Sequence, residues 1–416
     1  QTPNSKLETV ANPSAAKQPH FAPRAKRVIF LFMKGGPSHV DTFDPKPLLD
    51  RDDGKPFPGQ KPRVQFAPTL DLLKSPWKFQ NYGQSGLPVS ELFPHVAQCI
   101  DDLCILRSCH GTNPAHGGAL LKLHTGSDNF VRPSMGAWVN YWGAAFLPAW
   151  TQGTPIGNAA VPSDKALVRH INPRLAPSEQ RQQLDLLTAR WSRFIAATGP
   201  NPALEGRLNS FELAFRMQMA MPEAQDISRE SAATKQLYGL DDKVTENFGR
   251  QCLMARRFAE RGVRFIQVSH SDADVQWDQH GNLRKGHTKN AAEVDRPIAG
   301  LLKDLKARGL LQDTLVLWGG EFGRTPAAQG GRDGRDHNPE GFTMWMAGGG
   351  VKPGIAYGAT DDYGWFAAEN KIHIHDLHAT LLALLGMDHE HLTYRHAGRD
   401  FRLTDVEGRV VTDIFA

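Results

Sequence analysis

The sequence has few cysteines and no long hydrophobic run. Four cysteines occur in 416 residues, and no two of them have the C-x-x-C spacing of a structural zinc site. We predict buried thiols for Cys99, Cys104, Cys109 and Cys252, with one disulfide as the alternative if the protein is exported. Because no apolar run approaches the roughly 18 residues that a bilayer requires, we expect no membrane span.

The sequence also lacks an excess of either charge. Lys and Arg together number 48 and Asp and Glu 44, and this net charge of +4 is too small to indicate a nucleic-acid partner. Residues 1–25 are polar and contain proline, as expected of a linker left after a signal peptide is removed, which predicts a periplasmic or extracellular protein. An ordinary disordered terminus is an equal alternative. Residues 26–416 are predicted to form one domain.

Short apolar runs, each bounded by glycine or polar residues, predict buried strands. They are found at 27–33, 103–106, 263–268, 314–318 and 342–346. Helical patterns separate several of these runs, so the fold class is α/β, with a mostly parallel sheet and helices on both faces. Between about 177 and 262 apolar residues recur at three- and four-residue spacing, which predicts a helical insertion that covers the sheet or walls a cleft.

Polar side chains follow the first predicted strand. Lys34, His39 and Asp41 lie in the segment KGGPSHVDTFDPKP, directly after a buried run. The carboxyl ends of strands in an open α/β sheet are where ligands usually bind, so these residues are candidates for a metal or anion site. A simple turn is the alternative, because Asp and Ser beside Gly and Pro are common turn formers.

Two later strands are followed by similar clusters. Asp278, His280 and His287 come after the strand at 263–268, and Asp278-x-His280 offers the ligand types of a transition metal or a hard cation. Glu321 and Arg324 follow the strand at 314–318. A loop that is polar only for solubility is the alternative for each cluster.

Three further groups of residues complete the candidates. Asp336 and His337 are adjacent in the glycine-rich segment after Arg324. His116 lies where a strand turns into a predicted helix, a place where backbone N–H groups can face an anion, although local capping or packing is the alternative. His373, His375 and His378 begin another predicted helix, for which capping is the favoured interpretation and metal binding the alternative.

Seven segments, taken in order from about Lys26 to the end, resemble a sulfatase-like family of unknown function in the alkaline phosphatase-like superfamily. They are FLFMKGGPSHVDTFDPKP, HGTNPAHGGALLKLHTG, RPSMGAWV, WDQHGN, LVLWGGEFGRTP, GRDHNPEGF and HDLHATLLALLGMDHEHL. The resemblance implies a metal site that holds a phosphate or sulfate ester. His116 falls about where a sulfatase nucleophile precedes a Thr-Gly pair, here Thr125-Gly126, and the absence of C-x-P-x-R makes formylglycine chemistry improbable. Lys34 stands where the family's first acidic ligand is expected, so Asp41 would replace it.

These features together predict a sulfate ester hydrolase that acts on sulfated carbohydrates, with phosphatase or phosphodiesterase activity and an inactive secreted binding protein as alternatives. One or two divalent ions (zinc, manganese or calcium) would be held by metal-ligand side chains. The proposed ligands are Asp41, Asp278, His280, Asp336 and His337, with His39 and Glu321 as further candidates. Arg324 and Lys34 would hold anionic oxygens, His287 would protonate the leaving group, and His116 would attack or assist a water. Trp77, Trp142, Trp277 and Trp365 are predicted to present aromatic faces to sugar rings.

Overall fold

The computed structural model describes residues 19–62, 68–140, 153–158, 161–199, 201–271 and 276–416. Its centre is a seven-stranded sheet with the order β10-β4-β9-β6-β1-β5, in which β13 also pairs with β4. The strands of this sheet are β1 (Arg27–Met33), β4 (Leu103–His110), β5 (Phe265–His270), β6 (Thr314–Gly319), β9 (Phe342–Ala347), β10 (Ile355–Tyr357) and β13 (Ile372–His373). Within it, β9 pairs antiparallel with β4 and β6, and the other pairs are parallel. The predicted α/β fold with a mostly parallel sheet is confirmed.

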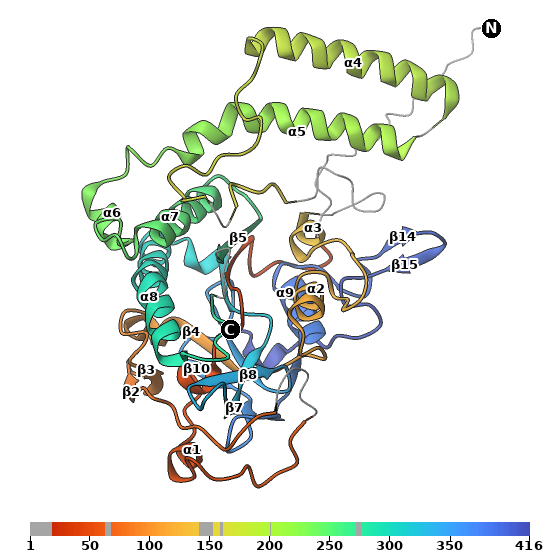
Figure 1. The fold of residues 1–416 in the computed structure, drawn as a ribbon. Helices are drawn as coiled ribbons and strands as arrows, with labels where there is room; N and C mark the ends of the chain where they lie inside the picture. The colour runs from red at the N-terminus through yellow and green to blue at the C-terminus, as the bar shows by residue number, and fades with distance from the viewer. Residues whose placement is uncertain (1–18, 63–67, 141–152, 159–160, 200, 272–275) are drawn as a thin grey trace, which may run out of the picture.

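The residues of β1 alternate between two hydrophobic cores, one on each face of the sheet. Ile29, Leu31 and Met33 belong to one core, whereas Val28, Phe30 and Phe32 belong to the other. Successive side chains of a strand point to opposite faces, so a continuous apolar run is what a strand covered on both sides requires. Helices α7 and α8 supply residues to the first core, and α2, α3 and α9 supply residues to the second (Figure 1).

The helices follow the sequence pattern with some shifts in their limits. Their bounds are α1 (Pro47–Arg51), α2 (His116–Thr125), α3 (Met135–Asn140), α4 (Pro177–Thr198), α5 (Pro202–Gln225), α6 (Ala232–Leu237), α7 (Glu246–Glu260), α8 (Leu283–Ala307) and α9 (Ile374–Leu384). Helices α4 and α5 pack on each other and stand away from the sheet in Figure 1, and no residue of α4 is buried. Among the described residues, no helix is long and apolar enough to cross a membrane.

A hairpin that the sequence did not suggest follows β6. Strands β7 (Gly323–Gln329) and β8 (Gly334–Asn338) pair antiparallel, with Arg324 opposite His337, and all their residues are buried. The remaining short strands form two-stranded pairs: β2 (Phe79–Tyr82) with β3 (Leu87–Ser90), β11 (Ala359–Thr360) with β12 (Ala367–Glu369), and β14 (Tyr394–His396) with β15 (Arg399–Phe401). The glycines of this region had indicated a loop. The hairpin instead delivers Asp336 and His337 from a regular strand.

All four cysteines are buried free thiols, so the disulfide alternative is not formed. Burial raises the pKa of Cys104 and Cys109 to about 12. Thiols that are this difficult to ionise are poor nucleophiles, which agrees with a packing role. Of the predicted N-terminal linker, residues 1–18 lie outside the described part of the chain.

Candidate active site

The candidate site lies at one edge of the sheet. Strands β1, β5 and β6 are mutually parallel, and β4 runs in the same direction, so their carboxyl ends meet there. The segment after β5 carries Asp278 and His280, β4 leads to His116 at the start of α2, and β6 leads to the hairpin β7–β8. Gly35, after β1, has a φ of +106°, and a Cβ there would lie 2.7 Å from the backbone nitrogen of Asp278. Only glycine allows the two segments to approach so closely.

Asp278 is the centre of the site. Its Oδ1 lies 3.0 Å from Nε2 of His280 and 3.0 Å from Nε2 of His337. The same oxygen accepts a hydrogen bond from the guanidinium of Arg324, at 2.5 Å. Although burial raises the pKa of Asp278, hydrogen bonds from the surrounding histidines outweigh it and hold the pKa well below its usual range. The carboxylate is therefore ionised.

The outer nitrogens of the two histidines determine where their protons lie. Nδ1 of His337 donates to the carbonyl oxygen of Pro114, at 2.6 Å, and Nδ1 of His280 donates to the side-chain oxygen of Gln329. A neutral imidazole carries a single N–H, so each Nε2 then presents a lone pair. The two Nε2 atoms are 3.0 Å apart. Burial lowers the pKa of His337, which favours its neutral form, whereas the hydrogen bond with Asp278 raises the pKa of His280.

Two imidazole nitrogens and a carboxylate oxygen that converge in this way repel one another unless a proton or a metal cation lies among them, and a metal cation can bind all three at once. The outer hydrogen bonds of His280 and His337 are those that orient metal-bound histidines in proteins. Two groups of potential ligands result, one of His116, Asp278 and His337 and one of His280, Asp336 and His337. Nitrogen and carboxylate ligands of this kind fit a divalent transition-metal ion. On this ground the residues fit the metal that the sequence predicts.

His116 adjoins this group and is held by a buried acid. Its Nδ1 lies 2.7 Å from Oε1 of Glu321, and its Nε2 lies 3.1 Å from Oδ2 of Asp278. Both oxygens of Glu321 accept from the backbone N–H of Gly35, at 3.0 and 3.2 Å, which fixes the acid in place. Although burial favours the neutral imidazole, the bonds to Asp278 and Glu321 outweigh it and raise the pKa of His116 to about 9. This arrangement is that of a base oriented by a carboxylate.

The family model described as "Protein of unknown function (DUF1501)" matches residues 25–142 and 140–415, which together span almost the whole chain. The chain belongs to this DUF1501 family. No curated protein matches its sequence significantly.

Solved structures resemble this DUF1501 protein only remotely. Ps i-CgsB in complex with k-i-k-neocarrahexaose is 10% identical, covers 89% of this chain and 73% of its own, and gives a TM-score of 0.37. The phosphonate monoester hydrolase SpPMH from Silicibacter pomeroyi is 13% identical over 71% of this chain and 69% of its own, with a TM-score of 0.31. The lipoteichoic acid synthase LtaP from Listeria monocytogenes is 9% identical over 90% and 76%, with a TM-score of 0.34. The chemistry of the DUF1501 site therefore has to be inferred from its own residues.

The structure does not bring Asp41 into the group around Asp278. Asp41 is fully buried, and its two oxygens accept from Nε and Nη2 of Arg335, at 2.7 and 3.1 Å. The hydroxyl of Ser38 also donates to it, at 2.5 Å. Although burial raises the pKa of Asp41, Arg335 outweighs it and lowers the pKa. The charge of Asp41 is thus matched within the protein, and both oxygens are already occupied.

Two further histidines of this DUF1501 protein that the sequence analysis selected, His39 and His287, also lie outside the group around Asp278. His39 is buried, and its Nε2 donates to the carbonyl oxygen of Gly364, at 2.7 Å. His287 lies inside α8, and its Nε2 accepts from the backbone N–H of Ser38, at 3.1 Å. Burial lowers the pKa of His287 to about 3, which favours the neutral imidazole, and its Nε2 is occupied by the backbone, so the structure gives no support to His287 as the acid.

The two predicted anion-binding residues are placed differently from each other. Arg324 is fully buried, and its donors face Gly35, Gly36 and Asp278, so it anchors Asp278 to the loop after β1. Lys34 begins that loop, where its backbone carbonyl accepts from the N–H of Trp277, at 3.1 Å. Among the supporting residues, Gln329 and Arg335 were missed by the sequence analysis. Both lie on the hairpin β7–β8, whose alternation of facing side chains was hidden by the surrounding glycines.

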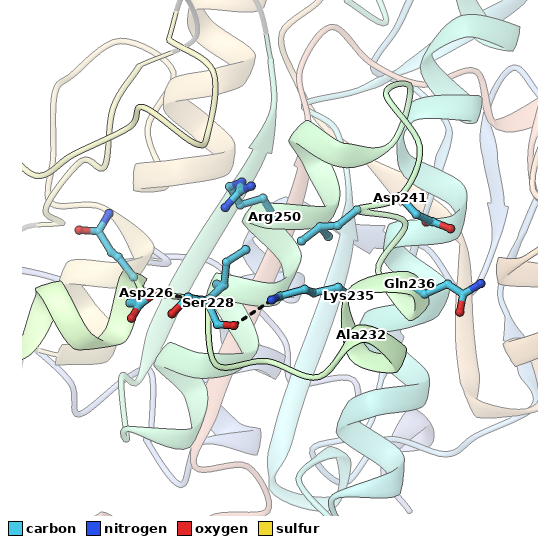
Figure 2. A pocket seen from close by; sticks show the side chains of 10 residues that line it. Asp226, Ser228, Ala232, Lys235, Gln236, Asp241 and Arg250 are labelled. Atoms are coloured by element: carbon cyan, nitrogen blue, oxygen red, sulfur yellow. Dashed lines mark hydrogen bonds between the residues drawn. The ribbon is translucent and has the colours of Figure 1, made fainter.

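A hollow in the described part of the chain lies away from this site. It has a volume of about 760 Å³ and is formed by the end of α5, helix α6 and α7 (Figure 2). Its charged groups are paired within the protein: Lys235 donates to the carbonyl oxygen of Ser228, at 2.9 Å, and Asp241 pairs with Arg296, at 2.8 Å. None of its lining residues belongs to the group around Asp278, so its size does not identify the active site.

Proposed function

We propose that this protein hydrolyses sulfate esters at a single divalent metal ion held by Asp278, His280 and His337, with Asp336 beside them. The observation that carries this proposal is the convergence of the Nε2 atoms of two histidines on the Asp278 carboxylate, next to a histidine oriented by a buried acid. When bound, such an ion supplies electrophilic activation of an ester oxygen and neutralises developing negative charge.

His116 acts as the general base in this proposal. Glu321 holds Nδ1 of His116, so Nε2 faces the reaction centre. Without an ion, and despite burial, Asp278 and Glu321 raise the pKa of His116 to about 9; an ion held by Asp278 would oppose that shift and allow Nε2 to act as a base. That nitrogen removes a proton from water as the water oxygen bonds to sulfur. The sulfur–oxygen bond to the alcohol breaks, and the departing alkoxide takes up a proton from solvent. The imidazolium that forms stays hydrogen-bonded to Glu321. Direct attack by Nε2, which would give a histidine–sulfate adduct, is the competing mechanism for the same residue.

The number of ions bears on the choice between sulfate and phosphate. The two potential ligand groups share His337, whose Nε2 can bind one ion, and this favours one ion rather than two. A sulfate monoester carries one negative charge and a phosphate monoester up to two, so a single ion suits the less charged group better. Phosphatase activity is the second candidate, because Oδ1 of Asp336, 3.7 Å from Nδ1 of His280, is placed to help hold a second ion.

The proposal stops at the ester and does not extend to a sugar. Trp277 and Trp365 are fully buried and Trp77 is 8% exposed, so these three do not offer the aromatic faces that the sequence suggested. Trp142 lies outside the described residues. The supposed sugar-binding surface therefore gives no support to a carbohydrate substrate, and the choice of alcohol is a matter for substrate screening.

The test combines metal analysis with hydrolysis of one aryl sulfate and one aryl phosphate. We expect about one metal ion per chain, sulfate release, and a loss of activity of roughly a hundredfold or more in Asp278→Asn and in His116→Gln. Asp388→Asn, which alters an exposed acid paired with His391, is the matched control and should have no effect. Phosphate release with two ions per chain would replace the sulfatase by the phosphatase. Trapping a sulfated His116 after rapid quenching would replace the base by the nucleophile.

A further inference from the structure

A second group of metal-ligand side chains lies at the start of α9, apart from the candidate active site. His373, His375 and Glu407 bring ligand atoms within 4.8 Å of one another. His375 contacts Gly126 at the C-terminal end of α2, whereas His116 begins that helix. A helix of that length is about 15 Å long, so the two groups are separate.

The hydrogen bonds of His375 show what its inner nitrogen faces. Its Nε2 lies 2.8 Å from the carbonyl oxygen of Gly126, which can only accept, so this nitrogen carries a proton. Its Nδ1 lies 2.9 Å from Oε2 of Glu407. A neutral His375 would point a lone pair at a carboxylate, so a positive charge has to lie between them.

His373 adds a further acceptor to the same point. Its Nδ1 accepts a long bond, of 3.3 Å, from the backbone N–H of His375, and therefore also presents a lone pair. The same Nδ1 lies 3.6 Å from Oε2 of Glu407. A proton on His375 would satisfy Glu407 but would leave Nδ1 of His373 with only the long bond from the backbone N–H of His375, whereas a metal ion can use all three ligands.

The three ligands are held in place before any ion binds. Asp376 joins their two segments: one oxygen accepts from the N–H of His373, at 3.1 Å, and the other from the N–H of Arg409, at 2.7 Å. A Cβ at Gly408 would lie 3.0 Å from the carbonyl oxygen of His375, so the loop with Glu407 packs directly on the start of α9. Glu407 itself is 59% exposed, which leaves the group open to solvent.

We propose that His373, His375 and Glu407 bind a second divalent transition-metal ion, best matched by zinc. Two imidazole nitrogens and one carboxylate are a common zinc ligand set, and the outer bond from His375 to a backbone carbonyl is the support such ligands usually have. His110, opposite His373 in the β4–β13 pair and with its ring centre 5.1 Å away, is the nearest additional imidazole. The ion would connect the end of α2, the start of α9 and the C-terminal loop. This inference does not depend on the proposed function.

The test counts zinc in variants that separate the two sites. In Asp278→Ala/His337→Ala, which removes ligands from both groups at the active site, we expect about one zinc ion per chain after equilibration with zinc and removal of the excess. Adding Glu407→Gln should weaken the remaining site at least tenfold in competition with a chelating dye. Zinc content and affinity are measured by elemental analysis and dye titration, and circular dichroism checks the fold.

Two controls keep the result interpretable. His391→Ala alters an exposed His–Asp pair, 2.7 Å apart, that is not part of the proposed group, and should leave zinc binding unchanged. Glu407→Gln alone, in the otherwise unaltered chain, should lower total zinc by one ion and so does not rely on the double variant folding. The proposal is overturned if the double variant folds and binds no zinc, or if Glu407→Gln retains full affinity. In the first case, a proton on His375 would be the charge that Glu407 requires.

Discussion

Asp41 and Asp278 follow neighbouring strands of the same sheet, yet their surroundings differ in one decisive respect. Asp41 is fully buried, and Arg335 occupies both of its oxygens. Asp278 is partly exposed and, beside Arg324, faces the Nε2 atoms of His280 and His337. Asp41 thus has its counter-charge within the fold, whereas Asp278 is surrounded by further hydrogen-bond acceptors. We call Asp41 the matched carboxylate and Asp278 the open one. An open carboxylate is the one expected to bind a cation, because its neighbours also need a positive charge.

The largest expected effect comes from altering the open carboxylate. Asp278→Asn removes the charge at the centre of the acceptors, so we expect loss of the bound metal ion and of ester hydrolysis to near background. The fold should be retained, because the side chain keeps its shape and is partly exposed. Elemental analysis, hydrolysis and a thermal melt measure the three quantities. Full metal content in this variant would mean that the ion is held elsewhere.

Substitution of the matched carboxylate, Asp41, should lower stability and leave metal binding unchanged. Asp41→Ala leaves the buried guanidinium of Arg335 without its carboxylate partner, which typically costs about 3–5 kcal/mol in the free energy of unfolding. Metal content should be unchanged at a temperature where the variant is folded. The double variant Asp41→Leu/Arg335→Met should recover most of the stability, since replacing both charges by apolar groups is often nearly neutral. Loss of metal from a stably folded Asp41→Ala would erase the distinction between the two carboxylates.

The sequence analysis selected both Asp278 and Asp41 as metal ligands, and it could not distinguish the open carboxylate from the matched one for a physical reason. Apolar runs and the polar residues after them predicted the sheet and placed His116, Asp278 and His337 at one edge, because parallel strands end together. Arg335, the partner of Asp41, lies 294 positions away in the sequence, on a hairpin whose many glycines are more typical of a loop. Pairing at that separation is decided by tertiary packing, and no local pattern reports it. The buried Trp277, expected on the surface, was misjudged for the same reason.

Glu321 extends the comparison to a carboxylate that serves another side chain. Glu321→Gln replaces one of the two accepting oxygens by an NH2 group, so the side chain can no longer accept from both His116 and Gly35 through two oxygens. The imidazole of His116 then loses its fixed tautomer and orientation. We expect kcat for ester hydrolysis to fall about a hundredfold, with little change in KM and with metal content retained. Steady-state kinetics alongside elemental analysis measure this. If metal is lost together with activity, Glu321 is a ligand, as the sequence analysis had allowed.

Asp295 provides the smallest effect and a third way to accommodate a buried carboxylate. It is 3% exposed and accepts only from the backbone N–H groups of His95 and Val96, both at 2.8 Å. Burial outweighs these two bonds and raises its pKa to about 6. Between the unfolded pKa of about 4 and this value the native state binds more protons than the unfolded state, so stability falls as pH rises through that interval.

We therefore expect Asp295 to lower the melting temperature of the wild type by a few degrees between pH 4 and pH 6, relative to Asp295→Asn, which cannot ionise. The quantity to measure is the difference between the two melting temperatures across the pH range, because other groups that titrate in both proteins cancel in it. A difference that does not change with pH would show that the two N–H bonds compensate the charge of Asp295 as fully as Arg335 compensates that of Asp41. Asp295, whose partners are backbone N–H groups, would then be as well compensated as Asp41. In that case only the convergence of further acceptors on a carboxylate, as at Asp278, would indicate a ligand site.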